Sequence, residues 1–303
     1  MSVARVIVNA DDFGLSRGIS DAVLTAHKDG ILTSASLMAN QAASEYAIGL
    51  LRQMHGVGVG VHLNLTAGRP VLAAGEVPSI VDGDGNFYRL PTLSRRLWRF
   101  QVSGVEIAAE FCAQIRWLKA RGVVPVHADS HQHVHLYPAA LSPFVGALQA
   151  EAISCARAPR CSVWPAGGPA GGPHEGALAR RLAVQAYRTA VQLTVLSGFT
   201  SPHSRISFRS AERRDRTATA RCWSAAFDNL PGDDFELTCH PGVAEAGFSE
   251  SDGIAAQREE DLRALTSTDI RKAVERNGIH LIRYADLHTK TLRQERTSEV
   301  TAA

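Results

Sequence analysis

The chain has 303 residues, of which 45% are hydrophobic and 20% are charged, so it can bury a sizeable core. Its formal net charge of +2 at pH 7 argues against nucleic-acid binding, which usually requires a basic patch or stripe. No apolar run approaches the ~20 residues of a membrane span, and no signal peptide is indicated, so we expect a cytoplasmic protein. The five cysteines are odd in number and include no Cys-x-x-Cys pair, which argues against a disulfide framework.

In chain order, apolar runs of strand length alternate with segments of helical periodicity. A first strand is expected at Val3–Ala10, and Ser16 is a suitable N-cap for a helix that runs to Lys28. Further strands are expected at 32–39, 57–65, 123–128, 235–239 and 280–284, and further helices at 42–54, 105–121, 138–151 and 254–277. This alternation favours parallel βα units. We therefore predict an α/β fold, namely a distorted (β/α) TIM-like barrel in a single domain, with a doubly wound open sheet as the alternative.

The predicted domain spans residues 1–288. Residues 66–91 are rich in Gly, Pro and Asp and are expected to be irregular. The segment PAGGPAGGPHEG at 165–176 has the composition of a flexible loop. The polar stretch 289–303 is expected to be a disordered tail.

Polar clusters follow four of the predicted strands. They are Asp11-Asp12, His62 with Asn64, the segment Asp129–His135, and His240 before Pro-Gly. In parallel α/β folds the carboxyl ends of the strands converge on one face, and functional sites form there. The four clusters therefore predict one site built from separate strands.

The adjacent carboxylates of Asp11 and Asp12 repel each other, and a divalent cation would compensate the repulsion. One carboxylate could then bind the ion while the other acts as a base. The alternative for one of them is a cap or turn residue before Gly14.

The histidines strengthen the metal interpretation. Alternation along a strand places His62 and Asn64 on one side, and a persisting strand would align Asp129 with His131, His133 and His135. Imidazole and carboxylate ligands suit zinc or another first-row ion, and Asp129 could orient a histidine ligand through its second nitrogen. A buried core histidine at 62 and an exposed His-rich loop at 129–135 are the alternatives.

These motifs resemble the YdjC-like carbohydrate deacetylases, a group that includes chitooligosaccharide deacetylases and deacetylases of hopanoid biosynthesis. The resemblance covers most of residues 1–290. It rests on VNADDFGLS at 8–16, LTSAS at 32–36, GVHLNL at 60–65, DSHQHVH at 129–135 and HPG at 240–242.

The resemblance implies a distorted barrel that removes the acetyl group from an N-acetylated amino sugar. It implies one divalent metal ion, zinc or magnesium, with Asp12, His62 and His131 as ligands. Asp11 is the implied base and His240 the implied acid. The candidate substrate-binding residues are Asn64, His133, His135 and His203.

His203 lies in Ser-Pro-His-Ser at 201–204, which departs from the family's Asp-His-Phe segment. The expected partner is the acetylated sugar, with a homodimer as a possible assembly.

Two other functions fit parts of the pattern. A phosphoesterase on the same scaffold would be favoured by a two-metal site, whereas the candidate ligands in this sequence suffice for one metal. A carbohydrate-binding protein without catalysis is the second alternative. Asp11 and Asp12 argue against it, because sugar binding needs no such carboxylate pair.

Overall fold

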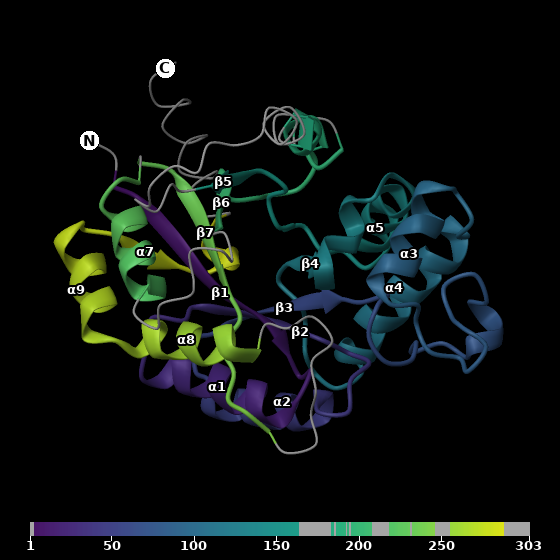
Figure 1. Ribbon diagram of the computed structural model, residues 1–303, viewed down its shortest axis with the longest axis horizontal. Helices are drawn as coiled ribbons and strands as arrows, with labels where there is room; N and C mark the ends of the chain where they lie inside the picture. Colours follow the sequence, from purple (N-terminus) through teal and green to yellow (C-terminus); the bar gives the residue numbers. More distant parts are fainter. Residues whose placement is uncertain are drawn as a thin grey trace, which may run out of the picture.

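The computed structural model describes residues 3–163, 183–207 except 185, 192 and 194, 218–245 except 231, and 255–287. Figure 1 shows a central sheet with helices around it. The expected loop at 165–176 and the expected tail at 289–303 lie outside the described residues. No helix in the described part is long and apolar enough to cross a membrane.

The described strands form one sheet in which the registered pairs are all parallel. They are β1 (Arg5–Phe13), β2 (Ser34–Leu37), β3 (Gly58–Leu63), β4 (Ala128–Ser130), β5 (Cys161–Val163), β6 (Ser204–Ser207), β7 (Asp234–Cys239) and β8 (His280–Ile282). The order is β4-β3-β2-β1-β7-β6-β5, and β8 pairs with the first residues of β1. Strands from both ends of the described chain therefore meet at β1.

The two ends of this strand order are joined by single parallel bridges. Ala128 in β4 bridges Ala156, and Cys155 bridges Thr200, just ahead of β6. The segment before β5 thus fills the gap and curls the sheet back on itself. The distorted (β/α) barrel is confirmed, and the open doubly wound alternative is not the observed topology.

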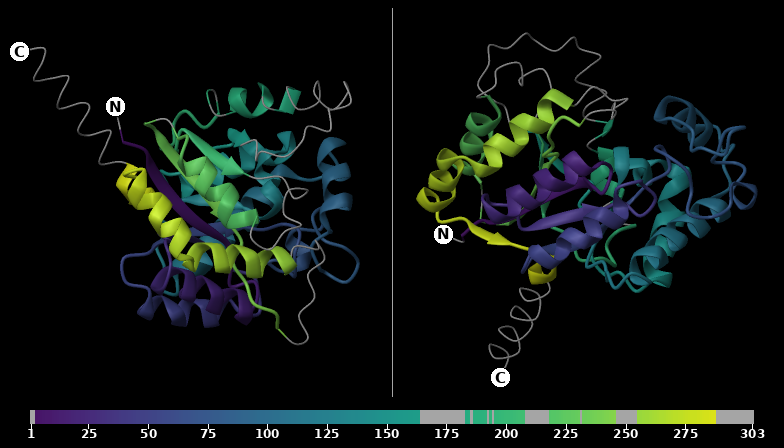
Figure 2. Two further views of the ribbon diagram at one scale, coloured as in Figure 1. Left: turned by 60° about the vertical axis from the view of Figure 1, so that its left-hand side comes forward. Right: turned by 90° about the horizontal axis from the view of Figure 1, so that it is seen from below.

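The helices pack in two groups outside the strands (Figures 1 and 2). One group joins α1, α2, α7, α8 and α9 through neighbouring contacts, and the other joins α3, α4 and α5 beside β3. The bounds are α1 (Arg17–Lys28), α2 (Ser44–Leu50), α3 (Leu90–Trp98), α4 (Gly104–Lys119), α5 (Pro138–Ala150), α7 (Ala218–Phe227), α8 (Ala255–Thr266) and α9 (Thr268–Arg276). Ser16 caps α1, as predicted, because its side chain accepts a hydrogen bond from the Ile19 amide.

Three expectations about elements were wrong in detail. The helix expected at 254–277 is two helices, because Ser267 ends one and caps the next by accepting from the Ile270 amide. The strand expected at 123–128 is displaced to β4, after Pro125, which has no amide to donate. The region expected to be irregular ends in helix α3, which begins at Leu90.

Polar side chains are buried where the strands of the barrel face one another, instead of the branched apolar residues common inside TIM barrels. They include Asn9, Ser36, His62, His127, Asp129, Arg157 and Glu236, each no more than 2% exposed. Gly60 in β3 makes room for this layer, because a side chain there would overlap the ring of His127. The apolar core lies between the strands and the helices.

Candidate metal centre

The adjacent aspartates lie at a bulge near the end of β1. The register with β2 shifts between Ala10 and Phe13, and Asp12 adopts a left-handed conformation with φ of 63°. In a regular strand, neighbouring side chains point to opposite faces. The extra residue of the bulge and the left-handed turn, which aspartate tolerates better than most residues, bury both carboxylates in the same site.

The structure brings Asp12, His62 and His131 together. Oδ1 of Asp12 lies 2.8 Å from Nδ1 of His131 and 3.2 Å from Nε2 of His62. Donor atoms of the three buried residues lie within 4.8 Å of one another, close enough to hold one metal ion. Two imidazoles and one carboxylate form a donor set that zinc and related first-row ions prefer, and they leave coordination positions open.

His62 is oriented from behind by Asp129. Nδ1 of His62 lies 2.6 Å from Oδ1 of Asp129, which leaves Nε2 to face Asp12. Ser36 donates a hydrogen bond of 2.9 Å to the other Asp129 oxygen. Burial lowers the pKa of His62, but the Asp129 and Asp11 carboxylates outweigh burial and raise it to about 10. The contact between Asp129 and His62 is the carboxylate–histidine arrangement expected behind a metal ligand.

Asp11 is held by Arg157, a residue that the sequence analysis did not select. Nη1 of Arg157 lies 2.7 Å from Oδ2 of Asp11, and Nη2 lies 2.5 Å from Oδ1. Asn9 donates a further bond of 2.9 Å to Oδ1. Burial lowers the pKa of Arg157, but the surrounding carboxylates outweigh it and raise the pKa well above its usual value. The bidentate pair fixes the position of the Asp11 carboxylate and places a positive charge against it.

Arg258 compensates the second aspartate. Its Nη2 lies 2.7 Å from Oδ2 of Asp12, so that Oδ1 remains directed toward the two histidines. Burial raises the pKa of Asp12, but His131 and Arg258 outweigh burial and hold it well below its ordinary value. The repulsion between the aspartates is therefore reduced by an arginine on each.

Glu236 is a third charged residue, after Arg157 and Arg258, that was not predicted from the sequence. It lies in the middle of β7, between Phe235 and Leu237, and contacts Arg157 at 2.7 Å. Burial raises the pKa of Glu236. A glutamate inside an apolar strand can be recognised in the sequence as a candidate buried charge that needs a partner. Arg258 offers no such signal, because α8 is rich in charged residues throughout.

His240 follows β7 and lies beside Asp11. Its Nε2 is 3.8 Å from Oδ2 of Asp11, and its side chain is 30% exposed. The His240 amide donates to Asp261 on α8 at 2.8 Å, which anchors the turn. Burial lowers the pKa of His240. The ring therefore borders the buried centre and still reaches solvent.

The His-rich segment does not continue as a strand, so the expected period-2 alignment was wrong. β4 ends at Ser130, and Gln132 and His133 have φ of 53° and 55° within a short 3-10 turn. Only His131 joins the metal group; His133 contacts Nη1 of Arg205 at 2.6 Å. His135 stacks on Phe144 with centroids 4.6 Å apart, and burial lowers its pKa to about 3, so it is a neutral packing residue near neutral pH.

Asn64 forms the turn after β3. Its Oδ1 accepts from the amides of Thr66 and Ala67, and its Nδ2 donates to the carbonyl of Ala67 and to Asn40. These bonds hold the loop backbone and engage both ends of the Asn64 amide.

His203 lies at the opposite end of the strands from the aspartates. It is exposed just before β6, and its ring contacts Phe235 at a centroid distance of 6.1 Å. Phe235 pairs with Val6 of β1, five residues before Asp11 and therefore about 16 Å away along the strand. The structure does not bring His203 to the candidate centre.

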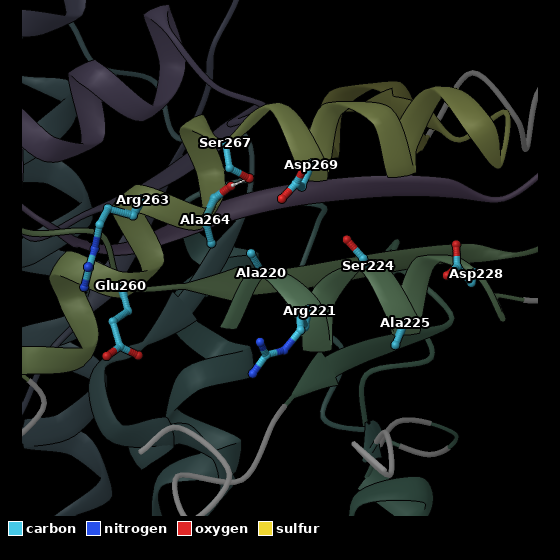
Figure 3. Close-up of a pocket in the computed structure, with 10 residues that line it drawn as sticks. All are labelled: Ala220, Arg221, Ser224, Ala225, Asp228, Glu260, Arg263, Ala264, Ser267 and Asp269. Carbon is cyan, nitrogen blue, oxygen red and sulfur yellow. Dashed lines mark hydrogen bonds between the residues drawn. The ribbon is translucent and has the colours of Figure 1, made fainter. Parts of the chain in front are cut away.

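A separate cavity of about 710 Å³ lies among α7, α8 and α9 (Figure 3). Its lining includes Arg221, Asp228, Glu260 and Arg263. None of its ten lining residues belongs to the Asp12 group. The cavity is therefore distinct from the candidate centre.

Fold and site together define a distorted (β/α) barrel with a buried Asp/His group that could hold a metal ion. The model of the YdjC-like protein family matches residues 5–276, and the chain belongs to this family. A Brevibacillus brevis protein named carbohydrate deacetylase is 31% identical over 293 residues, covering 93% of this chain and 99% of the relative. A protein of the same name from Geobacillus stearothermophilus is 30% identical over 285 residues, covering 93% and 97%.

A solved structure shares the fold. It is the crystal structure of a "putative cellobiose-phosphate cleavage protein" from Enterococcus faecalis V583, with a TM-score of 0.75 and 24% identity. The match covers 94% of this chain and 99% of that chain. The barrel architecture is therefore also that of a solved protein.

Proposed function

We propose that this chain is a metal-dependent carbohydrate deacetylase that hydrolyses the N-acetyl group of an amino sugar. The observation that carries the proposal is the buried group of Asp12, His62 and His131 beside the arginine-bound carboxylate of Asp11. The relatives named carbohydrate deacetylase, which align over most of the chain, support the same reaction.

The residues fit a single divalent ion. Asp12, His62 and His131 are the proposed ligands, and the Asp129 contact to His62 supports the geometry that a ligand needs. Imidazole nitrogens favour zinc or a related ion over magnesium, which prefers oxygen donors. When bound, such an ion supplies a Lewis acid that polarises the acetyl carbonyl and lowers the pKa of water.

Asp11 is the proposed general base. Arg157 and Asn9 hold its carboxylate in one orientation, so it is ready to accept a proton from the attacking water.

His240 is the proposed general acid. Its Nε2 lies 3.8 Å from Oδ2 of Asp11, so the proposed acid and the proposed base lie next to each other beside the Asp12 group. In the protonated form it donates a proton to the amine nitrogen as the bond to the acetyl carbon breaks. Its partial exposure allows it to regain the proton from solvent.

Acetate release from N-acetylglucosamine oligomers tests this proposal. Asp11→Asn should lower kcat by about 10²–10⁴-fold while the metal content stays at the wild-type level. Asp21→Asn, the same change on the exposed surface of α1, serves as the control. Full activity in the folded Asp11→Asn variant would exclude Asp11 as the base. A metal-loaded wild-type protein that releases no acetate from a broad panel of N-acetyl sugars would contradict the deacetylase proposal.

A further inference from the structure

A second group of potential metal donors lies directly against the first. Asp11, His62 and Asp129 also present donor atoms within 4.8 Å of one another, and all three residues are buried. The two groups share His62, whose Nε2 faces Asp12 and whose Nδ1 faces Asp129. Adjacent donor groups with a shared residue are a pattern that two-metal hydrolases could use.

The guanidinium of Arg157 already lies in this second group. A single nitrogen, Nη2, is 2.5 Å from Oδ1 of Asp11, 2.6 Å from Oδ2 of Asp129 and 2.7 Å from Oε1 of Glu236. The remaining guanidinium nitrogens bind two of the same side chains: Nη1 lies 2.7 Å from Oδ2 of Asp11, and Nε lies 2.9 Å from Oε1 of Glu236. One cation therefore contacts three carboxylates that come from three different strands.

The backbone of Arg157 holds this cation in place. The Arg157 amide donates to the carbonyl of Ala128 in β4, at 3.1 Å, in the segment that closes the barrel. The side chain is only 1% exposed. Because a guanidinium remains protonated at any physiological pH, its charge does not depend on whether a metal is present.

A metal ion in the second group would have to displace this guanidinium or lie beside a like charge. Either arrangement is unfavourable in a buried site, where charges are weakly screened. The first group differs, because Oδ1 of Asp12 and the two imidazoles face one another without an intervening arginine, and Arg258 approaches the opposite oxygen, Oδ2.

We propose that Arg157 takes the place of a second metal ion and thereby limits the centre to one ion, held by Asp12, His62 and His131. This inference rests on the proposed metal-dependent function. It assigns to Arg157 a specificity role, the exclusion of a second cation, in addition to its contact with Asp11.

Metal stoichiometry tests the inference. Elemental mass spectrometry of zinc-loaded protein gives the number of zinc ions per chain. Anomalous scattering from crystals of the same protein locates the ions. The wild-type chain should bind one ion in the Asp12 group. Arg157→Met should bind a second ion between Asp11 and Asp129, so that the ratio rises from one to two.

Two variants are matched controls for the loss of charge. Arg157→Lys retains a cation and should remain at one ion. Arg258→Met removes a similarly buried arginine that contacts the proposed ligand Asp12 and not the second group. This variant should bind no more than one ion per chain.

The outcomes separate this inference from the proposed function. Two ions in the wild-type protein would overturn the role of Arg157 and leave metal-dependent hydrolysis standing, and this measurement does not require any variant to fold. A folded Arg157→Met variant that still binds one ion would also overturn it. A wild-type protein that binds no ion would contradict both.

Discussion

Asp129 contacts the ring of His62 through a 2.6 Å interaction between its Oδ1 and Nδ1 of the imidazole. We expect Asp129→Asn to weaken metal binding by about 10–100-fold, the usual effect of removing a partner behind a metal ligand. The new amide would also place a donor group among Ser36 and Arg157, which donate to this side chain. Competition with a chromogenic chelator measures the change.

The same substitution at Asp228 is the control for Asp129→Asn. Asp228 is exposed and pairs with Arg276 on the surface. Its variant should bind metal as the wild type does. Equal metal affinity in wild type and Asp129→Asn would show that the contact with His62 does not support a ligand.

His240 and His203 are predicted to behave differently on mutation. We expect His240→Ala to lower kcat by about 10²–10⁴-fold with little change in KM, because it removes the proposed proton donor. His203→Ala should leave kcat unchanged, because His203 lies near Phe235 at the other end of the strands. Steady-state acetate release measures both variants, and a similar loss in the two would contradict this placement.

Gly60→Ala is predicted to destabilise the fold by about 1–3 kcal/mol, the typical cost of overpacking a core. The added methyl group would overlap the ring of His127. That ring has no room to shift, because it stacks on Tyr284 with ring centroids 3.8 Å apart. Urea unfolding gives the free energy. Gly49→Ala provides the matched control: this residue lies on the exposed face of α2 with open space around it, and alanine there should stabilise by about 0.5–1 kcal/mol.

The ion pair between α4 and Glu151 is predicted to make stability depend on pH. Glu151 contacts Arg116 at 2.7 Å and Lys119 at 2.9 Å. Burial raises the pKa of Glu151, but the hydrogen bonds from Lys119 and Arg116 outweigh burial and lower it. The stabilisation is therefore fully present above the ordinary glutamate pKa of about 4.3 and is lost as the pH falls through the lowered pKa of the folded state.

Glu151→Gln should accordingly cost about 1 kcal/mol of unfolding free energy at pH 7. The difference from wild type should shrink as the solution is acidified below the ordinary glutamate pKa. Urea unfolding of wild type and Glu151→Gln, at pH 7 and at a pH below the ordinary glutamate pKa, measures this difference in unfolding free energy. A difference that stays constant on acidification would show that the charge of Glu151 does not contribute.

Sequence reasoning predicted the barrel from local patterns, and it predicted the residues of the candidate metal group from motifs that resemble one family. Apolar runs followed by Asp11-Asp12, His62 and His131 could be recognised one strand at a time. Parallel topology then placed the ends of those strands together. The predicted alignment of His133 and His135 was wrong because β4 ends at Ser130 and a left-handed turn follows at residues 132 and 133. Histidine adopts positive φ more readily than most residues, but the segment contains no glycine or asparagine to mark the turn.

By itself, the sequence determined the type of fold through periodicity and, through its resemblance to one family, named three residues that could hold a metal ion, since periodicity and motifs are properties of short segments. Only the tertiary structure decided how the charges are balanced. Arg157 and Arg258 lie 146 and 246 residues along the chain from the aspartates that they contact. Such pairs leave no pattern in a single sequence, because a salt bridge depends on where folding places two side chains and not on their spacing along the chain. The two aspartates consequently have different surroundings: Asp12 faces the histidines, and Asp11 is bound by the guanidinium of Arg157.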